Sequence, residues 1–212
     1  MKSLESIYNS ILLETQNPNS IDLELLKSCI IDGTYTINDD GSIDVDGSVD
    51  ISNKRLTKIP FNFRNVSGDF WCNSNQLSSL KGAPNNVGGE FDCSDNRLTS
   101  LESAPNSVGG NFICYDNQLT SLEGAPITVG GGFDCTCNNL ISLKGAPNRV
   151  GDNFLCYNNP NLPYSELFKI VDNVKDDIYY SPDYLPEDKD KIRRDREVKG
   201  VLKDDELGNL DV

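Results

Sequence analysis

Apolar and polar residues alternate in a pattern that recurs every 21 residues through the middle of the chain. Phenylalanine, cysteine, leucine, asparagine, proline and valine each keep a fixed place in this unit. The phenylalanines are Phe70, Phe91, Phe112, Phe133 and Phe154, the cysteines Cys72, Cys93, Cys114, Cys135 and Cys156, and the asparagines Asn75, Asn96, Asn117, Asn138 and Asn159. Agreement among so many columns predicts a solenoid of stacked, nearly identical coils.

Each unit reads V-G-G-x-F-x-C-x-x-N-x-L-x-S-L-x-G-A-P. Phe and Cys alternate with variable residues, which predicts a short strand with one buried face. The Asn column follows in a turn, where we expect its amides to bond the backbone of adjacent coils, because buried polar backbone must be satisfied. The register extends back to Val45, so the predicted solenoid covers residues 45–159.

This unit resembles the core of leucine-rich repeats, in which a short strand leads into an Asn-containing turn. The L-T-S-L-x-G-A-P half is similar to the extended convex side of the short repeats of bacterial effectors. The resemblance implies an α/β fold: a leucine-rich-repeat solenoid with 21-residue repeats, a parallel concave sheet and an extended convex side. The catalytic ubiquitin-ligase domain of the effectors has no counterpart in this sequence.

A closer resemblance is carried by T-Y-T-I-N-D-D-G-S-I-D-V-D-G-S-V-D-I-S-N at 34–53 and K-I-P-F-N-F-R-N-V-S-G-D-F at 58–70. Both segments resemble leucine-rich-repeat proteins encoded by large tailed bacteriophages. The resemblance implies a phage origin and no particular activity. Residues Met1 to Thr15 lack the basic segment and long apolar stretch of a secretory signal. We therefore expect the protein in the host cytoplasm or in the virion, and not secreted.

The flanking segments predict helical caps, which repeat proteins need at both ends. Residues 1–44 form the expected N-terminal cap, with helices at 3–14 and 20–32 and a β-hairpin that turns at Asp39-Asp40-Gly41. Residues 160–180 form the expected C-terminal cap, a helix from Pro163 to about Tyr179. Residues 181–212 are charge-dense and predict a mobile tail, within which 189–199 could form a solvated helix.

The composition limits the kinds of partner and of binding site that the chain is expected to have. The formal net charge of −14 argues against nucleic acid as a partner, because phosphate binding needs clustered Lys and Arg. No apolar run has the ~20 residues that a membrane span needs.

The seven cysteines and the absence of histidine predict reduced thiols. The Cys spacing does not suit zinc, and Cys137 is expected to be an exposed free thiol. The Asp-rich stretch 39–50 does not fit a calcium loop. We expect no metal and no cofactor.

An enzyme is the least favoured class, because the sequence lacks histidine, a nucleophile elbow, a P-loop and a dinucleotide fingerprint. Asp92 and Asp134 lie two repeats apart, or ~10 Å at the spacing of parallel strands. That separation would suit an inverting glycosidase, but an open sheet has no pocket to raise the pKa of one carboxyl group. No catalytic residue is predicted.

Binding is expected at the variable strand residues, which project from the concave face. The middle column combines carboxylates with the single Trp, an Ile and a Leu, and a second column contributes an Asn and two Tyr residues. Exposed apolar residues in one strip mark interfaces, and Trp and Tyr are frequent hot spots. The predicted partner-binding residues are Asp50, Trp71, Asn73, Asp92, Ile113, Tyr115, Asp134, Leu155 and Tyr157.

The favoured function is therefore a non-enzymatic module that binds a host or phage protein through this face. A structural or decoration component of the virion is one alternative. An acidic DNA mimic that inhibits a host DNA-handling protein is the other, motivated by the carboxylates Asp50, Asp69, Glu90, Asp92 and Asp134.

Overall fold

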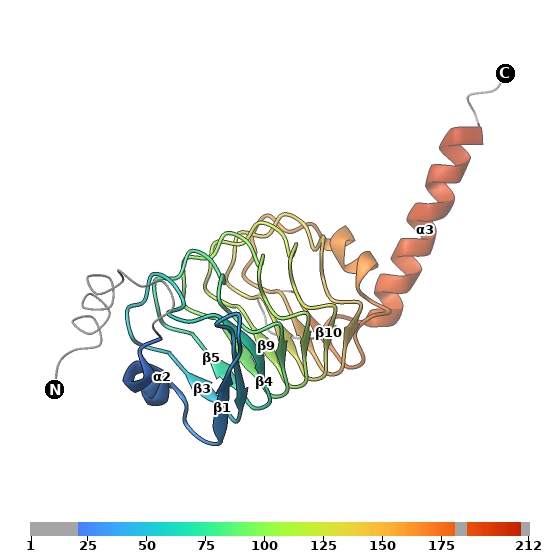
Figure 1. Ribbon diagram of the computed structural model, residues 1–212. Helices are drawn as coiled ribbons and strands as arrows, with labels where there is room; N and C mark the ends of the chain where they lie inside the picture. Colours follow the sequence, from blue (N-terminus) through green and yellow to red (C-terminus); the bar gives the residue numbers. More distant parts are fainter. Residues whose placement is uncertain (1–20, 181–185, 209–212) are drawn as a thin grey trace.

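The computed structural model describes residues 21–180 and 186–208 and shows a β-solenoid whose coils stack side by side (Figure 1). One seven-stranded sheet, sheet A, contains β3 (Val49–Asp50), β5 (Phe70–Trp71), β7 (Phe91–Asp92), β9 (Phe112–Ile113), β11 (Phe133–Asp134), β13 (Phe154–Leu155) and β14 (Ile178–Tyr179). All of its strand pairs are parallel. The predicted solenoid, its 21-residue spacing and its parallel sheet are confirmed.

A second seven-stranded sheet, sheet B, was not predicted. It contains β1 (Thr34–Ile37), β2 (Ile43–Asp46), β4 (Phe63–Val66), β6 (Asn86–Val87), β8 (Ser107–Val108), β10 (Thr128–Val129) and β12 (Arg149–Val150). Most of its strands are two residues long, with one buried Val and one variable residue. The strands of sheet A are equally short, but there Phe and Cys alternate with variable residues, whereas in these strands of sheet B a single Val is followed by glycine and no alternation marks the strand.

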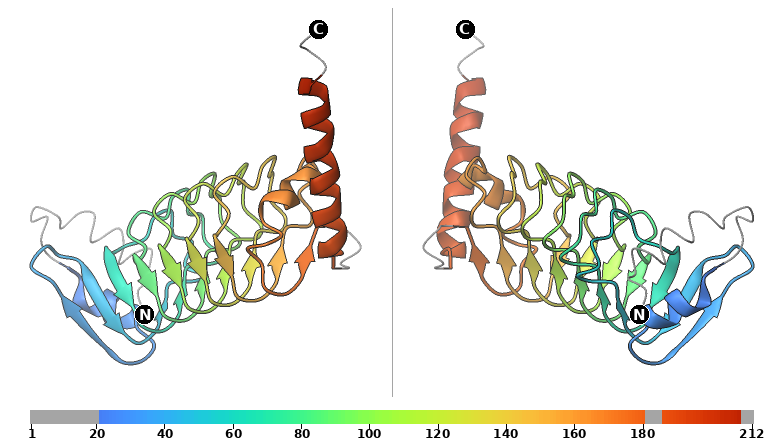
Figure 2. Two further views of the ribbon diagram at one scale, coloured as in Figure 1. Left: turned by 90° about the vertical axis from the view of Figure 1, so that its right-hand side faces the viewer. Right: turned by 90° about the vertical axis from the view of Figure 1, so that its left-hand side faces the viewer.

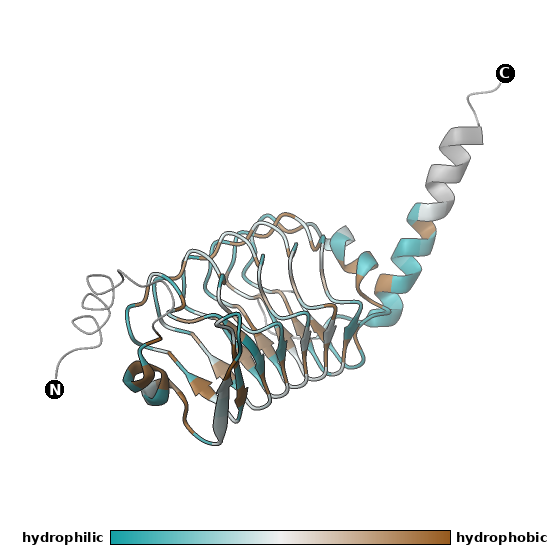
Figure 3. Ribbon diagram, in the orientation of Figure 1, coloured by the Kyte–Doolittle hydropathy of each residue, from teal (hydrophilic) through white to brown (hydrophobic). Residues whose placement is uncertain are grey.

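The core is built from columns of identical side chains. Figure 3 shows hydrophobic and hydrophilic segments in rows that repeat from coil to coil. The rings of the repeated phenylalanines are fully buried and stacked, with neighbouring centroids 5.1–5.6 Å apart and planes within 5–14°. Beside them run the Cys and Leu columns, also buried. The cysteines are free thiols, and burial raises the pKa of those in this column. Each coil therefore buries its apolar face only against its neighbours.

The asparagine column bonds each coil to the preceding one, as predicted. Asn117 shows the arrangement: its Nδ2 donates to the carbonyl oxygens of Cys93 at 3.0 Å and Cys114 at 3.2 Å. Its Oδ1 accepts from the backbone N–H of Leu98 at 2.9 Å. The same contacts recur at Asn96, Asn138 and Asn159. One buried amide thus satisfies backbone groups of two coils at once.

The N-terminal end carries a helix and the predicted hairpin. Helix α2 (Leu23–Cys29) begins at Asp22, whose Oδ1 accepts from the Leu25 N–H at 2.9 Å, and it buries Leu25, Leu26 and Cys29. It is shorter than the expected helix at 20–32. Strands β1 and β2 pair antiparallel across the expected turn, with Gly41 at a positive φ of 78°. The helix expected at 3–14 lies outside the described residues.

The predicted helix from Pro163 to Tyr179 is wrong in length. A 3₁₀ helix, η1, spans only Tyr164–Lys169, after which the chain turns and returns to sheet A as β14. Ile170, Val171, Val174 and Ile178 are buried. The spacing of these buried residues resembles one face of a helix. The chain forms a strand instead, because β14 pairs in parallel with β13 at Phe154 and Leu155, where sheet A would otherwise end in unpaired backbone groups.

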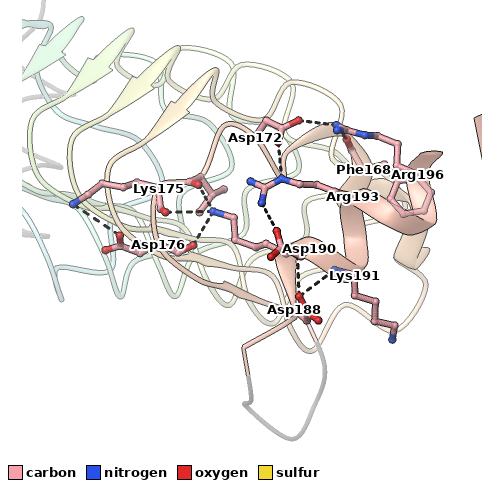
Figure 4. A network of polar contacts seen from close by, with 11 residues as sticks. Phe168, Asp172, Lys175, Asp176, Asp188, Asp190, Lys191, Arg193 and Arg196 are labelled. Carbon is pink, nitrogen blue, oxygen red and sulfur yellow. Dashed lines mark hydrogen bonds and ion pairs between the residues drawn. The ribbon is translucent and has the colours of Figure 1, made fainter. Parts of the chain in front are cut away.

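The expected tail contains a helix that begins where the possible solvated helix at 189–199 was placed and continues beyond it. Helix α3 spans Lys189–Gly208 and projects away from the coils (Figures 1 and 2). Ile192 in its first turn is buried, and Arg196 donates to the Phe168 carbonyl oxygen of η1 at 3.3 Å. Asp172, just after η1, pairs with Arg193 at 3.0 Å and with Arg196 at 2.8 Å (Figure 4). One apolar contact and a few ion pairs thus order a segment whose composition predicts disorder. No helix in the described ranges is long and apolar enough to cross a membrane.

Candidate functional site

The predicted binding residues gather on the outer face of sheet A. Its middle row, which we name the strip, consists of Asp50, Trp71, Asp92, Ile113, Asp134 and Leu155, neighbours on adjacent, in-register strands. Asn73, Tyr115 and Tyr157 follow two residues after strip positions, in the row beside it. All nine side chains are half-buried. All nine therefore point out of the core, as the alternation predicted, but the apolar ones are less exposed than the sequence analysis expected.

An alternation between coils, which the sequence analysis missed, organises this face. Every second coil has a carboxylate in the strip and a hydroxyl two residues later: Asp50 and Ser52, Asp92 and Ser94, Asp134 and Thr136. The coils between them carry larger pairs: Trp71 and Asn73, Ile113 and Tyr115, Leu155 and Tyr157. Ser94 and Thr136 are buried, whereas Tyr115 and Tyr157 stay partly accessible. The face is therefore ridged, with apolar ridges on alternate strands.

The strip carboxylates are engaged in turns of their own coils. Oδ1 of Asp92 accepts from the N–H of Ser94 at 2.9 Å and from its Oγ at 2.6 Å. Oδ1 of Asp134 accepts from the N–H of Thr136 at 3.0 Å. Burial between larger neighbours raises the pKa of both carboxyl groups. Each of these acids thus holds the end of its own strand through Oδ1.

Replacing Asp92 and Asp134 together by asparagine is expected to raise the free energy of unfolding at neutral pH. A folded-state pKa above the ordinary value of 3.8 means that the fold penalises the ionised carboxyl. Stability is therefore lost as pH rises through these pKa values and stays lost above them. Asparagine keeps the Oδ1 acceptor without the charge.

Urea unfolding of wild type and the double variant at neutral and at acidic pH measures this effect. The higher free energy of unfolding of the double variant should disappear below the ordinary pKa of Asp, because wild-type Asp92 and Asp134 are then neutral in both the folded and the unfolded chain. Asp50→Asn is the matched control, because Asp50 is the first residue of the strip and has a large strip neighbour, Trp71, on one side only. A double variant less stable than wild type at neutral pH would contradict the argument.

A third row lies on the other side of the strip and links the strands. It consists of Ser48, Asp69, Glu90, Asn111, Gly132 and Asn153. Oδ1 of Asp69 accepts from the Glu90 N–H at 2.7 Å, and Oδ1 of Asn111 accepts from the Gly132 N–H at 2.8 Å. Glu90 accepts from the Trp71 indole N–H at 3.2 Å, which fixes the ring. Gly132 has no side chain and interrupts the row.

At this interruption lies a shallow open hollow of about 230 Å³. Its lining residues are Asn111, Ile113, Gly132, Phe133, Asp134, Asp152, Asn153 and Leu155. Ile113, Asp134 and Leu155 were predicted from the sequence, whereas Gly132 and Asp152 were not. The signal that could have identified the hollow is the single glycine in a row of polar side chains.

A larger hollow, of about 380 Å³, lies on sheet B against the hairpin. Its polar side chains bond one another: Nδ2 of Asn65 donates to Asp44 and Nδ2 of Asn86 donates to Asn65, each at 3.0 Å. Asp44 also pairs with Arg64, which holds the pKa of the carboxyl well below its usual range. These groups satisfy one another, so we place the candidate site on sheet A.

The face offers little for catalysis or metal binding. Asp92 and Asp134 have Ile113 between them on the intervening strand and are both bonded within their own coils. Within residues 21–180 and 186–208, no group of three Cys, Asp or Glu side chains is placed to hold a metal ion. Cys137 is half-buried rather than fully exposed, and its sulfur accepts from Asn158 Nδ2 at 3.5 Å.

We compared the chain with known families, proteins and structures. No protein-family profile, curated protein or solved structure matches the chain.

Proposed function

We propose that this chain is a leucine-rich-repeat-type solenoid that binds a protein partner through the outer face of sheet A and performs no catalysis. The observation that carries the proposal is the ridged strip, which places Trp71, Ile113 and Leu155 on alternate strands of one face. Tyr115 and Tyr157 extend two of these ridges.

The ridges suit a protein surface. Parallel strands lie ~4.8 Å apart, so ridges on alternate strands recur at ~9.6 Å. Their side chains are held by neighbours in the row, and the Trp71 indole is also fixed by its hydrogen bond to Glu90. Rigid, partly accessible aromatic and aliphatic side chains lose little entropy when a partner covers them. A partner would contact several ridges at once.

The asparagine ladder supports the leucine-rich-repeat assignment, because this repeat class uses such a ladder to satisfy its turns. The chain segments at the two ends, α2 with the hairpin and η1 with α3, are proposed as its caps. They bury Leu26 and Ile192 against the end coils. The sequence resemblance described above motivates a phage origin, and hence a host or phage protein as the partner.

The arrangement favours this proposal over DNA mimicry. A mimic needs carboxylates that are free, ionised and exposed. Asp92 and Asp134 accept hydrogen bonds from their own turns, and burial raises the pKa of each. Asp69 likewise uses Oδ1 to accept from the Glu90 backbone.

Affinity capture with a ridge variant tests the proposal. Tagged wild type and a Trp71→Ser, Ile113→Ser, Tyr115→Ser triple variant are compared in host and phage-infected lysates, after circular dichroism and urea unfolding have shown that the variant folds. The matched control is Ile127→Ser with Ile141→Ser. Both isoleucines are 58% exposed and lie outside the strip, so their loss removes apolar surface elsewhere.

The expected result is a partner that wild type and the control retain and the triple variant loses, with affinity lowered at least tenfold in a direct titration, or about 1.4 kcal/mol. Equal retention by all three proteins would overturn the proposal. If the partner is a phage protein, mass spectrometry of purified particles separates a virion component from a protein made during infection.

A further inference from the structure

The hollow on sheet A exists because position 132 is glycine, and the backbone does not require glycine there. A Cβ at Gly132 would lie 3.4 Å from the Asn153 carbonyl oxygen and 3.6 Å from Asn111 Oδ1, which is ordinary contact. At Gly130 of the same coil, by contrast, a Cβ would lie 2.1 Å from the Gly109 carbonyl oxygen. Coil stacking demands glycine at 130 but leaves 132 free to carry a side chain.

The neighbouring coils show which side chain would fit. Asn111 and Asn153 hold the same place on the adjacent strands. An asparagine at 132 would continue their row and fill the space. Glycine opens a hollow of about 230 Å³, below the ~300–1,000 Å³ of typical small-molecule pockets and large enough for a single side chain.

The walls of the hollow have two chemistries. Ile113 and Leu155, both half-buried, provide apolar surface on either side of Asp134. The carboxylates of Asp134 and Asp152 provide negative charge. Each accepts a backbone N–H on Oδ1, from Thr136 at 3.0 Å and from Asn153 at 2.9 Å, and the Thr136 side chain also bonds Asp134.

Within the described ranges, no Lys or Arg forms an ion pair with Asp134 or Asp152. The ion pairs there involve other acids. Burial is the main cause that raises the pKa of Asp134, and no Lys or Arg is among the groups that shift it. A ligand with a positive charge would offset this effect of burial.

We propose that the hollow over Gly132 binds a lysine or arginine side chain of the protein partner. The aliphatic stem lies between Ile113 and Leu155, and the charged end reaches Asp134 and Asp152. Long basic side chains combine an apolar stem with a charged head in this way. This inference rests on the proposed function and specifies the partner chemistry at one point of the ridged face.

Binding of a single side chain can be measured by titration in NMR. The ¹⁵N-labelled full chain is titrated with Nα-acetyl-lysine methylamide and, separately, with Nα-acetyl-norleucine methylamide, which keeps the stem without the charge. The expected result is saturable shifts of the Gly132, Asp134 and Leu155 amides with the lysine compound, weakened by added salt. The norleucine compound should give at most a fifth of those shifts.

Two variants and a control sharpen the test. Gly132→Asn fills the hollow, and Asp134→Asn removes its charge while keeping the Oδ1 acceptor; both should reduce the shifts at least fivefold. Gly41→Asn is the matched control, because a Cβ there has open space and Asn tolerates the positive φ of the hairpin turn. It should titrate like wild type. Cooperative urea unfolding with a midpoint no lower than that of wild type shows that each variant is folded.

The inference is overturned if the lysine compound shifts no amide around Gly132, if norleucine shifts them equally, or if Gly132→Asn leaves the shifts intact. Its failure is distinct from failure of the proposed function. A captured partner that is lost by the ridge variant but bound at full affinity by Gly132→Asn would leave the ridged face in place and exclude the hollow.

Discussion

Phe112→Ala is expected to lower the free energy of unfolding by about 3–5 kcal/mol. The Phe112 ring is fully buried and stacked on both sides, with centroids 5.4 Å from Phe91 and 5.2 Å from Phe133. Its loss removes apolar burial and opens a cavity between two coils that the stacked rings on either side cannot fill. Because each coil is stabilised mainly by its neighbours, the interfaces on both sides weaken together.

Urea unfolding monitored by circular dichroism measures this loss. Phe61→Ala is the matched control, since Phe61 is half-buried and meets Phe63 edge-on at 6.0 Å, outside the stacked column. Phe61→Ala should lower the free energy of unfolding clearly less than Phe112→Ala does. A loss below 1 kcal/mol at Phe112, where burial is complete, would contradict the claim that the stack is the main apolar contact between coils.

Asn117→Asp is expected to cost about 3 kcal/mol or more at neutral pH. The amide nitrogen of Asn117 donates to the carbonyl oxygens of Cys93, Cys114 and Tyr115, at 3.0–3.2 Å. A carboxylate has no hydrogen to donate and would face these oxygens with a negative charge. Each buried polar group left unsatisfied costs about 1–3 kcal/mol, and more when a charge is involved.

The effect should depend on pH, because a protonated carboxyl recovers one donor and loses the charge. Urea titrations at neutral and acidic pH are therefore expected to show a smaller deficit at acidic pH. Asn106→Asp, at an exposed position in a loop, provides the control and should be nearly neutral at both. A deficit at Asn117 as small as that at Asn106 would mean that the ladder does not hold the coils together.

The repeating residues were predictable because each has one structural task that recurs at a fixed interval. The stacked Phe112 and the backbone-bonding Asn117 follow from periodicity and from the need to satisfy buried groups. Sheet B was missed because a strand such as Asn86–Val87 has one buried residue followed by two glycines, without the second alternating residue that Cys provides after Phe in sheet A. The chain after Pro163 was misread because buried residues at helical spacing serve a turn and the strand at Ile178 equally well.

The candidate site was predictable only in part. The outward direction of Trp71 and Ile113 follows from the alternation around Phe and Cys. Their half-burial does not, because it depends on neighbours across the sheet and, for Trp71, on the hydrogen bond to Glu90. The hollow exists because Gly132 has no side chain. A search of the sequence for residues with reactive or charged groups does not select a glycine. The sequence allowed a solvated helix at 189–199 but not its attachment to the coils, because that attachment depends on buried Ile192 and on the pairs to Asp172.

The alternation of carboxylate and apolar coils also constrains how this chain can change in length. Any coil can be duplicated or lost without breaking the Phe stack or the Asn ladder, since both repeat in every unit. Loss of one coil, however, would set two large strip residues side by side, as between Ile113 and Leu155 if the coil of Asp134 were removed. Loss of a pair preserves the spacing of the ridges. For the backbone the repeating unit is therefore one coil, but for the ridged face of sheet A it is two.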